Sequence, residues 1–148
     1  MSLIERTATA VSAAEADQIA RSVRTWLNTY TSKPATVDFE YLTETKGLAL
    51  TTVQAAYKTA EYIDGSYQAQ YQFALVYRTI PTSTEERMQA DEALNAFGAW
   101  AESMTALTLG TGLHPIKVIR NQPSALAYRY ENGAEDHQII MTLLYEVI

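Results

Sequence analysis

The chain has 148 residues, a formal net charge of −6 at pH 7 and no cysteine. This length suits one domain with an ordinary buried core, and we expect a single domain over residues 1–148. The missing cysteine excludes disulfides, thiolate nucleophiles and cysteine metal sites. The scattered, mainly acidic charge lacks the basic surface that non-specific nucleic-acid binding requires, and no apolar run approaches the roughly 20 residues that span a bilayer.

The first predicted helix covers residues 13–30. Ser12 and Glu15 have the spacing of a capping box, in which each side chain satisfies a free amide of the first turn. We expect residues 1–11 to form an N-terminal arm or an extra turn. Apolar residues recur at helical spacing after the cap, namely Ala16, Ile19, Ala20, Val23, Trp26, Leu27 and Tyr30.

Extended segments are predicted next, at residues 37–42, 48–54 and 57–63. In the first of them, strict alternation places Val37, Phe39 and Tyr41 on one face. The polar residues that follow, up to Gly47, are expected to form a turn.

A hairpin is the strongest local signal in the chain. Asp64-Gly65 separates two strand-like runs, and glycine adopts the positive φ of such a turn without steric cost. The return strand alternates, with Tyr67, Ala69, Tyr71, Phe73, Leu75 and Tyr77 on one face and Gln68, Gln70, Gln72, Ala74 and Val76 on the other. We expect this hairpin to project beyond the sheet and to donate edge pairing to a neighbouring subunit.

A second capping box, Ser83 to Glu86, begins a helix that is predicted to end near Thr108, before Gly110-Thr111-Gly112. Asn132-Gly133 forms a turn before a last strand that is apolar on both faces and therefore central. The predicted closing strands are 116–121, 125–131 and 137–147. This order predicts an α+β fold, with a mainly antiparallel β-sheet, two helices packed on it and the projecting β-hairpin.

No group of residues indicates an active site. His137 follows two acids but lacks zinc-like spacing, so we interpret it as a solvated loop residue rather than a metal ligand. Gly110-Thr111-Gly112 lacks the lysine of a phosphate loop, and Asp64 with Glu61 flanks a turn. Trp26 and Trp100 lie in apolar helical stripes and are expected in the core. We therefore expect no catalytic, cofactor-binding or metal residues, no cofactor, and no enzymatic activity.

The hairpin resembles the tail terminator, or minor capsid, proteins of siphophages and prophages. The residues that carry this resemblance are Tyr62-Ile63-Asp64-Gly65-Ser66, Gln68 to Gln72, and Phe73-Ala74-Leu75-Val76-Tyr77-Arg78. The order of elements is similar over nearly the whole chain: an N-terminal amphipathic helix, the hairpin, a long helix and closing strands that end in Ile140 to Val147.

The resemblance implies a structural virion protein, located in the tail or neck and assembled in the bacterial cytoplasm. Such a protein forms a homo-oligomeric ring, expected to be a hexamer, that caps the tail tube, stops its growth and provides the head-attachment surface. Its partners would be copies of itself, the major tail tube protein and the head-completion connector. DNA would pass through the lumen without specific binding, and no membrane would be involved.

The expected subunit or tube interface consists of Tyr62, Asp64, Gly65, Tyr67, Gln70 and Tyr71. Two other functions remain open on the residues alone. The chain could be a head-closure connector of the phage neck, or a small α+β ligand-binding or enzyme domain whose site is assembled from scattered residues.

Overall fold

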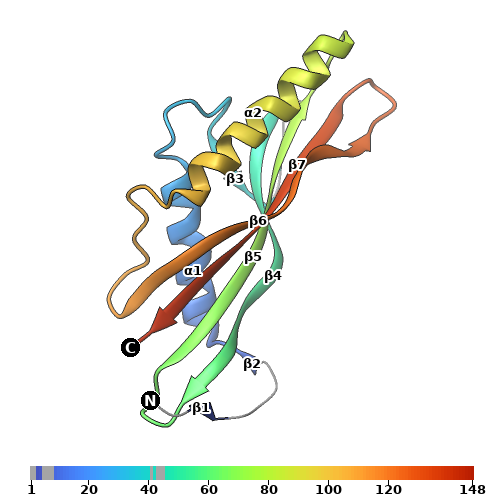
Figure 1. Ribbon diagram of the computed structural model, residues 1–148. Coiled ribbons are helices and arrows are strands. Elements are labelled where there is room, and N and C mark those ends of the chain that lie inside the picture. The colour runs from blue at the N-terminus through green and yellow to red at the C-terminus, as the bar shows by residue number, and fades with distance from the viewer. Residues whose placement is uncertain (1–2, 5–8, 41, 43–45) are drawn as a thin grey trace.

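The computed structural model describes residues 3–4, 9–40, 42 and 46–148. They form two helices and a seven-stranded sheet in the order β1-β4-β5-β7-β6, with β2 and β3 also paired to β4 (Figure 1). Only the β3–β4 pairing is parallel. The α+β class with a mainly antiparallel sheet is confirmed. The elements are β1 (Leu3–Ile4), β2 (Thr9–Ala10), α1 (Ala13–Leu27), β3 (Val37–Phe39), β4 (Gly47–Tyr62), β5 (Tyr67–Thr79), α2 (Thr84–Glu102), β6 (Leu113–Arg129) and β7 (Glu135–Val147).

Helix α1 begins as the sequence predicts, because Ser12 Oγ accepts a hydrogen bond from the Glu15 amide at 3.2 Å. The carboxylate of Glu15 does not complete the capping box but contacts two tyrosine hydroxyls of the sheet. The helix ends at Leu27, before the predicted residue 30. Its end is fixed by Asn28, whose side chain both donates to and accepts from the backbone of Val37.

Strand β3 is shorter than predicted. Val37 is fully buried, whereas Phe39, two residues further along the strand, is 44% exposed and lines a cavity beside α1. Glu40 has a φ of 63°, a backbone conformation that non-glycine residues rarely adopt. The strand therefore ends there, and the third member of the predicted face, Tyr41, lies outside the described residues.

Two pairs of predicted strands are in fact single long strands. Residues 48–54 and 57–62 belong to β4, and residues 116–121 and 125–129 belong to β6, so the predicted strands end one and two residues too late. Register shifts against β5 and β7 occur where the sequence suggests breaks. Such bulges insert an extra residue without ending the strand. Pro123 is tolerated within β6 because β6 is an edge strand.

The central hairpin and the last strand follow the sequence closely. Gly65 has a φ of 92°, and the Tyr62 amide donates to Ser66 O at 2.9 Å to close the turn. Strand β7 lies between β5 and β6, as its apolar composition predicts. Over its whole length β5 pairs with β7, from Tyr67 opposite Val147 to Thr79 opposite Glu135. Only the turn at 63–66 therefore extends past the neighbouring strand, and the hairpin is not a free ribbon.

Helix α2 also begins at its predicted cap, where Ser83 Oγ accepts from the Glu86 amide at 3.2 Å. It ends at Glu102 rather than near Thr108. The following residues leave the helix with positive φ angles of 53° at Met104 and 59° at Ala106. The Gly110–Gly112 segment consequently forms the turn into β6, not the end of the helix. Neither helix, within the described ranges, is long and apolar enough to cross a membrane.

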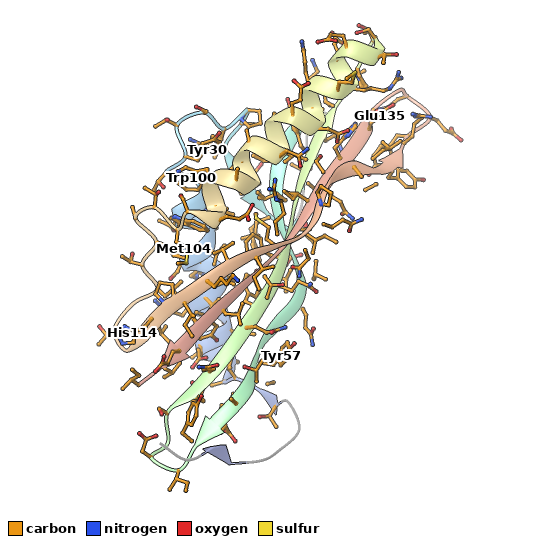
Figure 2. All side chains as sticks on the ribbon, in the orientation of Figure 1. Tyr30, Tyr57, Trp100, Met104, His114 and Glu135 are labelled. Atoms are coloured by element: carbon orange, nitrogen blue, oxygen red, sulfur yellow. The ribbon has the colours of Figure 1, made fainter. Side chains whose placement is uncertain are left out.

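Both helices pack on the same face of the sheet. Trp26 of α1 stacks on Trp100 of α2 with ring centroids 5.0 Å apart, and Tyr30 lies 4.9 Å from Trp100 (Figure 2). The aromatic contacts join the two helices over one core, as expected for the tryptophans. The strand residues buried beneath them include Leu48, Leu50, Ala69, Tyr71, Phe73, Leu75, Val118, Ile139, Met141, Leu143 and Tyr145.

Gly98 allows α2 to approach the sheet closely, and its replacement by alanine should destabilise the fold. An added Cβ would lie 2.5 Å from Ile139 Cδ1 and 3.1 Å from Arg120 Cδ, and Ile139 is fully buried. Overpacking costs about 1–3 kcal/mol, which exceeds the gain of about 1 kcal/mol in helix propensity. We expect Gly98→Ala to lower the free energy of unfolding, measured with urea.

The neighbouring exposed Ala99 supplies the matched control for this change. Ala99→Gly measures the propensity difference in the same turn of the helix and should cost about 1 kcal/mol. If Gly98→Ala instead raises the free energy of unfolding by as much as Ala99→Gly lowers it, the close contact between α2 and Ile139 does not limit packing.

Candidate assembly surface

The turn at 63–66 is the exposed tip of one end of the sheet (Figure 1). Ile63 is 71% exposed, and Asp64 and Gly65 are also at the surface. The Asp64 carboxylate accepts from the amide of Ser66 at 3.0 Å and from its hydroxyl at 2.7 Å. These hydrogen bonds lower the pKa of Asp64 and keep the turn closed. The tip therefore presents an apolar side chain on a well-defined turn.

The six residues predicted for the interface fall into three places. Asp64 and Gly65 are exposed at the turn, and Tyr62 is half-buried where β4 pairs with β1. Gln70 lies on the sheet face away from the core and donates to the hydroxyl of Tyr57. Tyr67 and Tyr71 lie on the core face, so the structure does not bring the six side chains together.

Tyr71 is 1% exposed, which corrects the expectation that its ring is presented to a neighbour. Its hydroxyl lies 2.8 Å from Thr52 Oγ1, and its ring lies 5.6 Å from that of Phe73. The physical reason is the alternation of β5: the aromatic positions are the ones that the helices cover. Burial also raises the pKa of Tyr71.

Glu15 ties the first turn of α1 to the sheet. Its carboxylate accepts hydrogen bonds from the hydroxyls of Tyr67 and Tyr145, the latter at 2.7 Å. Burial, then the hydrogen bond to Glu15, raises the pKa of both tyrosines. Lys58 lies 4.5 Å above the Tyr67 ring and 3.1 Å from Glu61. Tyr67 of the hairpin and Tyr145 of β7 thus anchor α1 within the chain.

The other face of the sheet, here called the open face, carries no helix among the described residues. It comprises Gln70 and Gln72 of β5 with Ile140, Thr142 and Leu144 of β7, and only Thr142 of these is buried. Gln72 donates to Thr142 at 3.4 Å, and Thr142 donates to Asn121 of β6 at 2.5 Å. These hydrogen bonds join β5, β7 and β6 through three uncharged side chains.

The opposite end of the sheet presents a second exposed tip, at the β6–β7 hairpin. Leu126 is 44% exposed and Tyr128 is 59% exposed. Behind them Arg78 makes a two-pronged pair with Asp136, at 2.7 and 3.0 Å, and donates to the Tyr130 hydroxyl at 2.8 Å. The hydrogen bond and charge of Asp136 raise the pKa of Arg78. This tip is built from aromatic and paired ionic residues.

His137 is not in a solvated loop, which corrects the sequence-based interpretation. It belongs to β7, is 2% exposed, and both of its ring nitrogens face carboxylates. Glu135 precedes His137 by two residues, but Asp91 is 46 residues away in the chain, and sequence reasoning missed that contact. A stripe of polar residues at four-residue spacing on α2, Arg87, Asp91 and Asn95, was the available signal.

Glu135 is the buried acid of this group, at 1% exposure (Figure 2). Its Oε2 accepts from the Nε atoms of Arg87 and Arg129, each at 2.9 Å. Burial alone would raise the pKa of Glu135, but hydrogen bonds from Arg87, Arg129 and His137 outweigh it and lower the pKa. The carboxylate is therefore held ionised.

The described residues contain no group of three His, Cys, Asp or Glu side chains placed to hold a metal ion. A cavity of about 530 Å³ lies beside α1 and is lined by Asp17, Ala20, Arg21, Arg24, Thr25 and Phe39. It is remote from His137 and from both tips. A scan against protein-family models finds no matching family, and a search of curated proteins finds no match either.

Glu15→Gln should lower the free energy of unfolding by about 1–3 kcal/mol. The two tyrosine hydroxyls donate to different oxygens of Glu15, and glutamine replaces one of these oxygens with an NH2 group, so one hydroxyl loses its acceptor and the other keeps an uncharged one. Urea unfolding measures the change. Glu92→Gln, at an exposed position of α2, is the control and should stay within about 0.5 kcal/mol of the parent. Equal effects of the two changes would contradict a specific role for Glu15.

Glu135→Gln should destabilise the chain at neutral pH by about 1–3 kcal/mol, because it removes the buried carboxylate to which Arg87 and Arg129, themselves partly exposed, both donate. The lowered pKa of Glu135 means that its stabilisation exists above the unfolded value of about 4.3 and is lost as pH falls through the folded value. The difference between parent and variant should therefore shrink from about pH 7 to about pH 3. Glu131→Gln, at an exposed position in the hairpin turn, should show no such trend, and a constant difference for Glu135→Gln would contradict the account.

Proposed function

We propose that the chain is a structural subunit of a phage tail, a tail terminator that forms a ring on the end of the tail tube and provides the surface for head attachment. The observation that carries this proposal is the pair of unlike exposed tips at opposite ends of one long sheet. Ile63 marks one tip, and Leu126 with Tyr128 marks the other.

The separation of the tips follows from strand geometry. Thirteen residues of β5 pair with β7 between the two ends, and at about 3.3 Å per residue this gives roughly 40 Å. A subunit that stands between a tail tube and a head connector needs two different contact surfaces, one for each neighbour. Large exposed apolar side chains among polar ones are typical of such surfaces.

Charge supports the same role. A net charge of −6 opposes adhesion of duplex DNA, which is what a ring around a DNA channel requires. The ring itself, which we propose is a hexamer, requires a heterologous contact between different patches of adjacent copies.

Ile63→Asp should abolish binding to the tube while leaving the monomer folded, because Ile63 is exposed and makes no core contact. The measurement is sedimentation and negative-stain electron microscopy of the purified chain, alone and with tail tubes assembled from the tube protein of the same phage genome. We expect rings seated on tube ends for the parent chain and bare tube ends for the variant. Unchanged thermal unfolding would show that the variant is folded.

Val53→Asp is the matched control, since Val53 is 48% exposed on β4 but lies between the two tips. It should still cap tubes. If the parent chain never appears on tube ends and binds DNA-filled heads instead, a head-closure connector is the better assignment. If it binds neither particle, the structural role in a phage is wrong.

A further inference from the structure

The cavity of about 530 Å³ beside α1, here called the α1 cavity, combines positive charge with an apolar wall. Two of its lining residues, Arg21 and Arg24, are cations, and Ala20 and Phe39 are apolar. Arg21 is exposed, and Phe39 is 44% exposed at the end of β3. A second cavity, of about 460 Å³, also includes Arg21 in its lining. The guanidinium group of Arg21 is therefore open to a partner from outside the chain.

The two arginines of the α1 cavity have no acidic partner within the described residues. Nε of Arg24 donates to Val37 O at 2.9 Å, and the side chain of Arg21 makes no hydrogen bond or ion pair to a described residue. Asp17, one helical turn before Arg21, lines the cavity without pairing with it. The other described arginines each have a carboxylate oxygen 2.7–3.0 Å from Nε, namely Arg78, Arg87, Arg120 and Arg129. In a chain of net charge −6, this pair of guanidinium groups favours a partner that supplies carboxylates.

The first half of α2 carries a surface of the opposite kind, here called the acidic stripe. It consists of Glu85, Met88 and Glu92, which are all exposed, Met88 at 53%. Their spacing of three and four residues places them on one side of the helix, with the two glutamates about 10 Å apart along its axis. Glu85 accepts from Gln89 at 3.4 Å, and the side chain of Glu92 makes no hydrogen bond or ion pair to a described residue. The stripe therefore presents an apolar side chain between two carboxylates.

The acidic stripe and the α1 cavity lie apart within one copy of the chain. Helix α1 meets α2 near the end of α2, where Trp26 stacks on Trp100. The first half of α2 extends away from α1 (Figure 1), and Glu92 precedes Trp100 by about 12 Å of helix. A contact between the two surfaces therefore joins two copies.

We propose that the α1 cavity binds the acidic stripe of a second copy of this chain. The carboxylates of the stripe pair with Arg21 and Arg24, and Met88 lies against the ring of Phe39, a favourable contact between a thioether and an aromatic ring. Because the two surfaces differ, each copy gives its stripe to one neighbour and its cavity to the other, and such heterologous contacts can close a ring. This inference rests on the ring of the proposed function and names the contact that forms it.

Charge reversal tests this contact by sedimentation velocity of the full chain, without tail tubes, over a concentration series at low salt. We expect the parent chain to self-associate. Arg21→Glu and Glu92→Arg should each weaken association about tenfold, because each change brings like charges together. An equal mixture of the two variants should associate like the parent, since each copy then meets an oppositely charged surface on a copy of the other kind.

Lys117→Glu and Glu131→Arg are the matched controls. They make the same changes of charge at exposed positions outside both surfaces, and they should associate like the parent. Thermal unfolding of Arg21→Glu and Glu92→Arg should match that of the parent, because neither side chain has a partner among the described residues. A loss of association in these variants then reports the contact and not the fold.

The contact is overturned if the parent chain stays monomeric over the concentration series, if either charge reversal leaves association unchanged, or if the mixture fails to restore it. It is also overturned if Arg21→Glu associates like the parent but no longer caps tail tubes, because the cavity then binds the tube protein. A parent chain that associates as expected but never appears on tube ends would contradict the proposed function and support the contact.

Discussion

The period-two alternation of β5 is the constraint on which the rest of the structure depends. Its aromatic positions, Tyr71 and Phe73 among them, are covered by both helices, while its glutamines remain on the open face. A shift of one residue in register would exchange these two sets. Because β4 and β7 flank β5 along its length, this one choice fixes which face of all the long strands is buried.

The same constraint explains why the hairpin tyrosines serve the chain itself. Tyr67 and Tyr145 reach Glu15 in the first turn of α1, so the strand that carries the hairpin also fixes the helix. Tyrosine enrichment is compatible with an interface and with a core. Only the position of each ring decides between them, and in β5 the rings face inward. The exposed surface at this end is left to Ile63 and the turn.

Local signals predicted well what local physics controls: both helix starts, the Asp64-Gly65 and Asn132-Gly133 turns, the alternation of β5 and the central place of β7. Local signals failed where contacts between residues far apart in the sequence determine the structure. The bulges in β4 and β6 are indistinguishable in sequence from strand ends, and the left-handed residue Met104 ends α2 without a glycine. The partners of His137 are Glu135, two residues before it on β7, and Asp91 of α2, 46 residues away. The sequence around His137 shows the nearby acid but not the contact with α2.

Helix α2 is therefore held by two kinds of contact along its length. Near Phe97 and Ala101 it packs on an apolar core, whose contribution changes little with pH or salt. Near Arg87 it is held by the ion pair with Glu135, which responds to both, and near Asp91 by the contact of that carboxylate with His137. The polar contacts of α2 also reach β6, since Asp91 and Asn95 both accept hydrogen bonds from Ser124. They therefore join the helix to the strand that carries the Leu126 and Tyr128 tip.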